Sequence, residues 1–431
     1  MKKGQPGAID TRRFKSYSAY KNTGVENTGE IPEHWEAMKL KRVCRLMYGS
    51  PLASTDRVAG EIQVFGSNGP VGTHEEANTL GPCLVIGRKG SFGRVNYSSR
   101  PVFAIDTTFF VDSNSSRTDI RWLYYALTNA RLDTVSKDSA IPGLDREEAY
   151  ACDIAVCPID EQRSIAVFLD RETSKIDALV NREQRLLGLL EQRRSSLIAH
   201  AVTKGLEQHT AMKDSCVEWL GKIPAHWEVQ RTKFAARLRS GHTPSRQNIA
   251  FWQNCTIPWF GLADVWQIRD GNIAYVTDTA EKISALGLAN SSARLLPKGT
   301  VIVSRTASVG FSAIMGVDMA TTQDFVNWVC GSTLRPEYLL YVFRSMGHEF
   351  RRLTMGSTHQ TIYMPDVGRF STPIPPIEEQ DLIVAFIREQ AAQIDALALK
   401  VREAIGRLAE LRTALISAAV TGKIDVREEV A

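Results

Sequence analysis

The sequence predicts an α+β protein with two pseudo-symmetric mixed α/β domains joined by two long antiparallel coiled-coil helices. Three observations support this fold class: an eight-residue frame occurs twice, short β-type runs follow each copy, and each copy ends in a long amphipathic segment. A repeat on this scale is typical of a two-domain molecule, because a solenoid needs more and shorter repeats.

The repeated frame is GEIPEHWE at residues 29–36 and GKIPAHWE at residues 221–228 of the 431-residue chain. A second match follows in the same order, with LVIGRKGSFG at residues 84–93 and VIVSRTASVG at residues 301–310. The distance from the frame to this match is longer in the second copy, so the second copy carries extra residues between them.

Each copy of the frame places a histidine and a tryptophan behind a proline. We expect Trp35 and Trp227 to enter the core of their domains after a proline turn. We interpret the neighbouring His34 and His226 as structural residues, because both lie inside the repeated frame and beside a tryptophan.

The region after each frame reads as a mixed domain with one helix near its end. Its β-type runs are broken by Gly, Pro, Ser and Asn, which are typical of turns. The β-type runs are CLVI, FAIDTTFFV, TVIV and DFVNWV. The predicted helix is RWLYYALTN from Arg121 in the first copy and EYLLYVFRS from Glu337 in the second.

A long amphipathic helix ends each copy, opening with CPIDEQ in the first and PPIEEQ in the second. Apolar residues recur there at steps of three and four, with Pro158 and Pro376 before the helix starts and Gly205 and Gly422 near the ends. A helix of about 40 residues is about 60 Å long, so its apolar stripe needs a partner of similar length. The other helix, packed antiparallel, is the simplest partner, and a core helix within its own domain is the alternative.

The predicted boundaries follow from these features. They are a basic N-terminal extension at 1–18, a first domain at 19–157, a first long helix at 158–205, a linker and second domain at 206–375, a second long helix at 376–423 and a C-terminal tail at 424–431.

The composition is that of an ordinary globular protein, with 43% hydrophobic and 23% charged residues. A net charge of +4 permits a nucleic-acid partner without arguing for one. No apolar run approaches the ~20 residues that span a bilayer, and no apolar segment follows the charged start, so we expect a cytoplasmic protein without a membrane partner. The seven cysteines are scattered without a CxxC pair, and we interpret them as buried small hydrophobic residues rather than metal ligands.

The sequence contains none of the patterns that would identify a catalytic site. It has no GxxxxGK[ST], GxSxG, HExxH or GxGxxG, and its eight histidines form no ligand pattern. We therefore predict no catalytic and no metal-binding residues in this chain.

The ordered set of IPxHW, a variable domain and an IDEQ or IEEQ helix ending in AVT, repeated twice, resembles the specificity subunit of type I restriction-modification systems. The second copy adds SGHTPSR, IPWFGLAD, LLPKGTVIVSR and GSTHQTIYMPDV, whereas the first departs with a cysteine at Cys157 where the second copy has a proline. The resemblance runs from about Ala19 to Lys423.

The resemblance implies that each domain is a target recognition domain that reads one half of a bipartite, asymmetric site in double-stranded DNA. The helices would set the spacer between the half-sites and dock two methyltransferase (modification) subunits. Those subunits would carry S-adenosylmethionine, and restriction subunits would use ATP and Mg, so no cofactor is expected in this chain.

Candidate DNA-binding residues lie in loops where the two copies differ between matched strands. Arg or Lys suits guanine O6 and N7, and Asn or Gln suits adenine N6 and N7, although each residue is as well suited to a phosphate or to solvent. The candidates are Ser67, Asn68, His74, Arg88, Lys89 and Arg94 in the first domain, and Thr243, Ser245, Arg246, Arg305, Thr306, Ser308, His359 and Gln360 in the second.

Two other functions remain open from the sequence. The chain could be a two-lobed coiled-coil adaptor that binds proteins without DNA sequence specificity. It could also be the recognition part of a split fused restriction-modification enzyme.

Overall fold

A computed structural model describes residues 14–25, 29–134, 143–207, 209–355 and 360–430. The chain forms two compact units: Met1–Gln184 with Arg402–Ala431, and Arg185–Val401. Each long helix therefore contributes one part to each unit.

The first unit contains a four-stranded sheet of order β4-β10-β7-β8 and a three-stranded sheet of order β6-β5-β9. Two antiparallel pairs, β1-β2 and β11-β3, complete its β-structure. The strands are β1 (Tyr20–Asn22), β2 (Glu30–Pro32), β3 (Glu36–Lys39), β4 (Met47–Tyr48), β5 (Ile62–Gly66), β6 (Gly69–His74), β7 (Cys83–Gly87), β8 (Val95–Ser98), β9 (Phe103–Ala104), β10 (Thr108–Asp112) and β11 (Asp153–Val156). The short helices are α1 (Leu40–Val43), η2 (Ser54–Asp56), α2 (Ile120–Asn129), η3 (Leu132–Thr134), α3 (Arg146–Tyr150) and η6 (Arg427–Val430).

The second unit repeats this plan with one more strand: its main sheet has the order β15-β22-β19-β20-β17, and its three-stranded sheet has the order β18-β16-β21. The pairs β12-β13 and β14-β23 match the two small pairs of the first unit. The strands are β12 (Met212–Asp214), β13 (Lys222–Pro224), β14 (Glu228–Arg231), β15 (Ala236–Ser240), β16 (Ile257–Phe260), β17 (Tyr275–Val276), β18 (Lys282–Ile283), β19 (Val301–Ser304), β20 (Ser312–Met315), β21 (Ala320–Thr321), β22 (Phe325–Cys330) and β23 (Ser371–Ile374). The short helices are α5 (Thr232–Ala235), η4 (Ile249–Trp252), η5 (Leu262–Ile268), α6 (Ala285–Ala289), α7 (Pro336–Ser345), α8 (Gly347–Thr354) and α9 (Met364–Val367).

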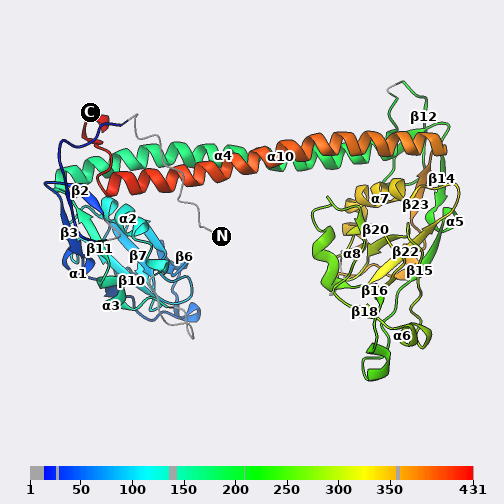
Figure 1. Cartoon of the computed structure of the whole chain (residues 1–431), viewed down its shortest axis with the longest axis horizontal. Coiled ribbons are helices and arrows are strands. Elements are labelled where there is room, and N and C mark those ends of the chain that lie inside the picture. The colour runs from blue at the N-terminus through cyan, green and yellow to red at the C-terminus, as the bar shows by residue number, and fades with distance from the viewer. Residues whose placement is uncertain (1–13, 26–28, 135–142, 208, 356–359, 431) are drawn as a thin grey trace. The chain divides into compact units, whose positions relative to one another are not determined.

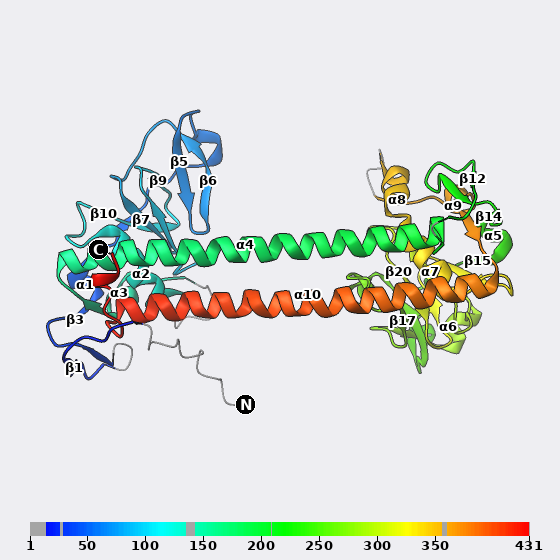
Figure 2. The ribbon, with the colours of Figure 1, turned by 90° about the horizontal axis from the view of Figure 1, so that it is seen from above.

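The two long helices are α4 (Ile159–Lys204) and α10 (Ile377–Val420), and within each unit a part of one lies beside a part of the other (Figure 1, Figure 2). In the first unit Arg412 Nε lies 3.0 Å from Asp177 Oδ1. In the second unit Arg194 Nε lies 3.6 Å from Asp395 Oδ1. The repeat relates Arg194 to Arg412 and Asp177 to Asp395, so the same ion pair fixes the antiparallel register twice, and the predicted helix pair is confirmed.

The apolar stripe of the long helices is buried in both units. In the first unit Ile176, Leu415 and Ile416 belong to the core of the mixed domain. In the second unit Ile198 and Ile383 belong to the core of the mixed domain, and Leu190 packs with Ile394 in a small cluster between the helices. Burial of one such side chain stabilises a fold by about 1.5–3 kcal/mol, so the stripe holds the helix pair to each domain.

The two tryptophans of the repeated frame are fully buried, as the sequence predicts: Trp35 and Trp227 are both 0% exposed. The end of a long helix packs on each frame. A Cβ at Gly422 would lie 2.3 Å from Cδ of Pro32, and a Cβ at Gly205 would lie 3.3 Å from Trp227 Cζ2. Both glycines have a positive φ, so they end their helices in the left-handed conformation that glycine adopts without strain.

The histidines of the frame bind the start of the long helix. His34 Nε2 lies 2.9 Å from Glu161 Oε2, and His226 Nε2 lies 2.9 Å from Glu379 Oε2. Glu161 and Glu379 are the glutamates before the glutamine of IDEQ and IEEQ. The two recurring motifs of each copy are therefore hydrogen-bonded to each other, which explains why they recur together.

The glutamine that follows each glutamate joins the long helix to the predicted helix of the mixed domain. Gln162 Oε1 accepts a hydrogen bond from Asp119 N, just before α2, at 2.9 Å. Gln380 Oε1 accepts one from Arg335 N, just before α7, also at 2.9 Å. The motif thus satisfies a backbone donor at the start of a neighbouring helix in both units.

Candidate nucleic-acid interface

Two loops of the first domain that are distant in sequence converge at the turn between β5 and β6. Ser67 and Asn68 form this turn, and Asn68 is exposed. Arg94, which precedes β8, is also exposed and donates a hydrogen bond to Asn68 Oδ1. The approach is close, because a Cβ at Gly87 would lie 3.0 Å from the carbonyl oxygen of Ser67. An amide and a guanidinium thus lie together at the surface.

Arg88 and Lys89 are held beside that turn by the loop before β10. Their backbone N–H groups donate to the carbonyl of Thr107 at 2.9 and 3.2 Å, and Ser67 Oγ donates to the same oxygen at 2.8 Å. The Arg88 guanidinium donates to the carbonyl of Asp106 at 2.9 Å and is half-buried, whereas Lys89 is exposed. Three of the predicted residues, Ser67, Arg88 and Lys89, therefore donate hydrogen bonds to the carbonyl of Thr107 or of its neighbour Asp106.

His74 lies apart from this group, at the end of β6, and is buried at 8% exposure. Its Nδ1 accepts a hydrogen bond from Val58 N at 3.1 Å, and its ring packs edge-on against Phe103. The His74 side chain is thus engaged inside the first domain.

In the second domain, Gln323 joins two of the predicted loops. Its side-chain Oε1 accepts a hydrogen bond from Thr243 Oγ1 at 2.6 Å, and its backbone carbonyl accepts one from Arg305 Nε at 3.0 Å. Arg305 also donates to the carbonyl of Ile362 at 3.3 Å. The comparison of the two copies did not identify Gln323 as a candidate, because nothing in the sequence indicates that it bonds to both Thr243 and Arg305.

The loop after β19 contacts the loop before α9. Ala307 N donates to the carbonyl of the exposed Gln360 at 2.9 Å, and Thr306 forms a bridge with Thr361. Ser308 N donates to the carbonyl of Thr306 in the same turn. Thr306, Ser308 and Gln360 are therefore brought together, whereas His359 lies outside the described residues.

Arg246 forms a separate cluster on the second domain. Its guanidinium lies 3.8 Å from the ring centroid of Trp252 and 5.3 Å from that of Trp259. It also pairs with Glu281, and the carbonyl of the exposed Ser245 accepts from Trp252 Nε1 at 3.0 Å. Stacking on two indoles orients the guanidinium and restricts its rotamers.

Comparison of the two copies distinguishes residues that hold a loop in place in both domains, called loop-holding residues, from residues that differ between the domains. Arg88 and Arg305 are equivalent, and each donates to the carbonyl of an equivalent residue, Asp106 or Gln323. Because this arginine–carbonyl hydrogen bond occurs in both domains, it cannot account for a difference in the DNA sequences that they bind. We interpret it as a bond that positions the loop. The exposed Asn68–Arg94 pair and the Arg246 cluster have no such counterpart, so they differ between the two domains.

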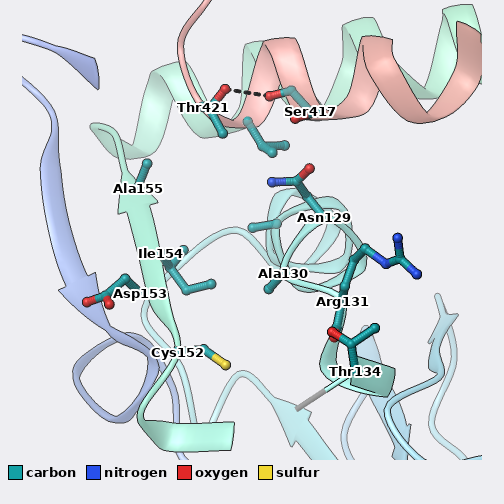
Figure 3. A pocket seen from close by; sticks show the side chains of 12 residues that line it. Asn129, Ala130, Arg131, Thr134, Cys152, Asp153, Ile154, Ala155, Ser417 and Thr421 are labelled. Atoms are coloured by element: carbon teal, nitrogen blue, oxygen red, sulfur yellow. Dashed lines mark hydrogen bonds between the residues drawn. The ribbon is translucent and has the colours of Figure 1, made fainter. Parts of the chain in front are cut away.

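A cavity of about 370 Å³ in the first unit lies between the end of α2, β11 and the last turns of α10 (Figure 3). Cys152 and Thr134 lie on opposite sides of it. At the position equivalent to Cys152 the second unit has Phe370, whose ring packs with that of Phe350 at a centroid distance of 5.6 Å. The second copy thus places an aromatic ring where the first has the smaller Cys152 side chain, which lines the cavity.

The cysteines are not all buried. Cys44, Cys83 and Cys157 are buried, but Cys216 is exposed, so the expectation for that residue was wrong. Cys216 has φ 56° in a tight turn before the second frame, a surface position that favours small or polar residues. Burial raises the pKa of Cys44 and of Cys330 to about 12, so both thiols are protonated at neutral pH.

Among the described residues, no three His, Cys, Asp or Glu side chains gather as metal ligands would. In the same part of the chain, every helix is too short or too polar to cross a membrane.

Comparison with known proteins identifies the family. The model of the type I restriction modification DNA specificity domain matches residues 32–187 and 224–405. The MjaIX specificity subunit of Methanocaldococcus jannaschii is 28% identical over 170 residues, which span 39% of this chain and 38% of that protein. The EcoR124I/EcoR124II specificity subunit of Escherichia coli is 24% identical over 69% of each chain. The putative MjaX specificity subunit of M. jannaschii is 20% identical over 95% of this chain and 98% of that one.

A solved structure shares the fold. It comes from a study of complex assembly and conformational transition in a type I R-M system, and it superimposes with a TM-score of 0.66. It is 14% identical in sequence and covers 90% of this chain and 98% of the solved one. With the family model matching both copies of the repeat, this chain belongs to the family of type I restriction-modification specificity subunits.

Proposed function

We propose that this chain gives a type I restriction-modification enzyme its DNA sequence specificity, with each mixed domain reading one half of a bipartite, asymmetric site. The observation that carries the proposal is the contrast between the two domains. Four strands of the main sheet, the hydrogen bond between the frame histidine and the long-helix glutamate, and the loop-holding arginine match in the two domains. The exposed side chains on the converging loops differ. A pair of unlike half-sites requires this combination, because each base pair presents its own donors and acceptors in the major groove.

The exposed loops carry groups suited to base edges. Asn68 pairs an amide with the Arg94 guanidinium, and Arg246 holds a guanidinium against two indoles. Amides suit adenine N6 and N7, and guanidinium groups suit guanine O6 and N7. We propose Asn68 and Arg94 as base contacts of the first half-site and Arg246 as a base contact of the second.

Of the remaining predicted residues, some are proposed to contact phosphates or base edges and others to hold the loops in place. Lys89, Ser245 and Gln360 are exposed on the same loops and suit phosphates or base edges. The loops are held in place by hydrogen bonds of the residues Ser67, Arg88, Thr243, Arg305, Thr306 and Ser308.

The long helices would dock the methyltransferase subunits through apolar side chains that the helix pair leaves uncovered. Leu179 on α4 and its repeat equivalent Leu397 on α10 are each 45% exposed. Further exposed apolar residues are Val167 and Leu411 in the first unit, and Leu189, Leu382 and Leu399 in the second. The equivalent pair Leu179 and Leu397, with further exposed apolar residues on the long helices of each unit, supports one methyltransferase subunit per unit, and the restriction subunits would join that complex.

In this proposal the chain itself performs no chemistry and holds no cofactor. S-adenosylmethionine would belong to the methyltransferase subunits, and ATP with Mg to the restriction subunits. Methyl transfer by the isolated chain would contradict this assignment.

The experiment is DNA binding by the chain in complex with its methyltransferase subunits. Methylome sequencing of the host gives both half-sites and their spacing, and labelled duplexes then compare that site with a scrambled one. We expect much tighter binding to the intact site, with affinity falling about a thousandfold over a fourfold rise in salt if six or more phosphates are neutralised. Equal affinity for both duplexes would favour the coiled-coil adaptor.

Single variants separate the two half-sites. Asn68→Ala should relax selectivity in one half-site only, and Arg246→Ala in the other, each by about 1–3 kcal/mol. Arg163→Ala is the matched control, because Arg163 is an exposed arginine on α4 outside the loops. A uniform loss over all DNA sequences would reassign the altered residue to phosphate contact.

A further inference from the structure

The main sheets of the two units differ at one edge. In the second unit β20 lies between β19 and β17, and β17 pairs parallel with β20. In the first unit the equivalent strand β8 ends the sheet, and among the described strands it pairs only with β7. Within the described residues, the first unit therefore has an open edge where the second unit has a strand of its own.

The difference arises from one connection. In the first unit β5 and β6 are joined by the short turn at Ser67 and Asn68. In the second unit the equivalent strands β16 and β18 are joined by residues 261–281, which include β17. The extra residues of the second copy thus provide the strand that covers β20.

Two arginines hold the start of this added segment in the second unit. Arg194 on α4 donates to the carbonyl of Gly271 at 3.0 Å, and Arg344 at the end of α7 donates to the carbonyl of Ile273 at 2.8 Å. Burial lowers the pKa of Arg344 to about 10. Backbone oxygens of the segment thus accept hydrogen bonds from two guanidinium groups.

Residues 274–276 of this segment then form backbone hydrogen bonds with the edge of β20. Ile314 N donates to the carbonyl of Ala274, and Gly316 N donates to the carbonyl of Val276, both at 2.7 Å. The β7–β8 register, with Leu84 opposite Tyr97, equals the β19–β20 register, with Val301 opposite Ile314. Tyr97 and Ser99 therefore hold the positions of Ile314 and Gly316, and their N–H groups face the open edge.

Cavities flank the open edge of β8 at both ends. One of about 630 Å³ is lined by Arg94, Val95, Arg131 and Arg412 among others. One of about 560 Å³ is lined by Tyr97, Ser98 and Ser99 among others. Arg412 is the repeat equivalent of Arg194. Among the described residues, cavities thus line the first unit beside β8 and Arg412, whose equivalents in the second unit, β20 and Arg194, bond to residues 271–276.

We propose that the edge of β8 is a binding site for an extended peptide segment of a protein partner. The segment adds a strand parallel to β8, with its carbonyls on the N–H groups of Tyr97 and Ser99. Before this strand it carries a turn rich in carbonyl or carboxylate oxygens, which lies against Arg412. Three arginines and one aspartate line that end of the groove, so an acidic turn fits best. Residues 270–277, DGNIAYVT, have the required chemistry.

The probe is a synthetic peptide of residues 269–278, added to the full chain and followed by hydrogen exchange of two segments. Residues 311–316 are the internal control, because β17 already covers them. In the free chain we expect residues 94–99 to exchange at least about tenfold faster than residues 311–316. The peptide should slow exchange of residues 94–99 only, and a scrambled peptide should not.

A matched pair of variants tests the role of Arg412. Arg412→Ala and Asp177→Ala both break the same ion pair, but only the first removes the guanidinium from the groove. We expect Arg412→Ala to weaken peptide binding about tenfold or more, and Asp177→Ala to leave it within about twofold, as for loss of one charged hydrogen bond. Equal effects of the two variants would refute the proposed role of Arg412.

Three results would overturn the site itself. One is equally slow exchange of residues 94–99 and 311–316 in the free chain, since the edge would then be covered already. The second is fast exchange of residues 94–99 that millimolar peptide leaves unchanged. The third is protection of residues 94–99 by duplex DNA and not by the peptide, which would assign the groove to the DNA interface.

Discussion

Replacing Glu161 with alanine should destabilise the first unit far more than the equivalent change destabilises the second. The Glu161 side chain is 5% exposed and accepts hydrogen bonds from His34 Nε2 at 2.9 Å, from Trp35 Nε1 at 3.2 Å and from the hydroxyl of Tyr17. Burial, and then the bond to this carboxylate, raise the pKa of Tyr17 above its ordinary value, so the hydroxyl remains a donor.

Loss of the carboxylate leaves two buried donors without a partner. Tyr17 is 6% exposed and Trp35 is 0% exposed, so water does not replace the lost acceptor. An unsatisfied buried donor costs about 1–3 kcal/mol, which gives about 2–6 kcal/mol for Glu161→Ala.

The second copy provides the matched control. Glu379 is 25% exposed and bonds to His226, whereas the buried Trp227 Nε1 has no hydrogen-bond partner among the described residues. Glu379→Ala should therefore cost about 0.5–1.5 kcal/mol, the net value of one ordinary hydrogen bond.

Native-state hydrogen exchange measures each unit separately in the same chain. The amides of β7 report the opening free energy of the first unit, and those of β19 report that of the second. Equal losses from the two variants, or a loss below about 1 kcal/mol from Glu161→Ala, would refute the argument that this carboxylate satisfies buried donors.

The other predictions use the same internal symmetry. Trp35→Phe should cost more stability than Trp227→Phe in the same exchange measurement, because only the Trp35 N–H has an acceptor; the reverse order would contradict this. Cys152→Phe should raise the melting temperature by filling the cavity beside it, and a lower melting temperature would show that the cavity cannot hold a ring. Leu179→Glu and Leu397→Glu should each remove one methyltransferase subunit in native mass spectrometry without unfolding the chain, and full retention of both would exclude the helix surface as the dock.

The sequence alone predicts the repeat and those elements, such as the two long helices, that have a clear apolar periodicity. The apolar periodicity after Pro158 and Pro376 predicts both long helices, which begin at Ile159 and Ile377. The frame tryptophan is large and apolar beside a proline turn, so its burial follows from local chemistry. These features depend on neighbours close in the chain, and one sequence is enough to find them.

The candidate DNA-binding site could be predicted only in part from the sequence. Variable loops between matched strands could be identified, but not which of them meet or which side chains remain exposed. Asn68 lies beside Arg94 because the β5–β6 turn approaches Gly87, and His74 is buried because its strand turns it toward Phe103. Such contacts depend on the order of strands in the sheet, which local pattern does not determine.

The sequence by itself determined that one unit was used twice, with one frame, one helix and two unlike sets of loops. Only the tertiary structure decided that Glu161 and Glu379 bind the frame histidines, that both long helices are shared between the units, and that β8 keeps an open edge. The physical reason is that repeats and periodicity are properties of adjacent residues. Hydrogen bonds between distant segments, and the edges they leave unpaired, exist only once the chain has packed.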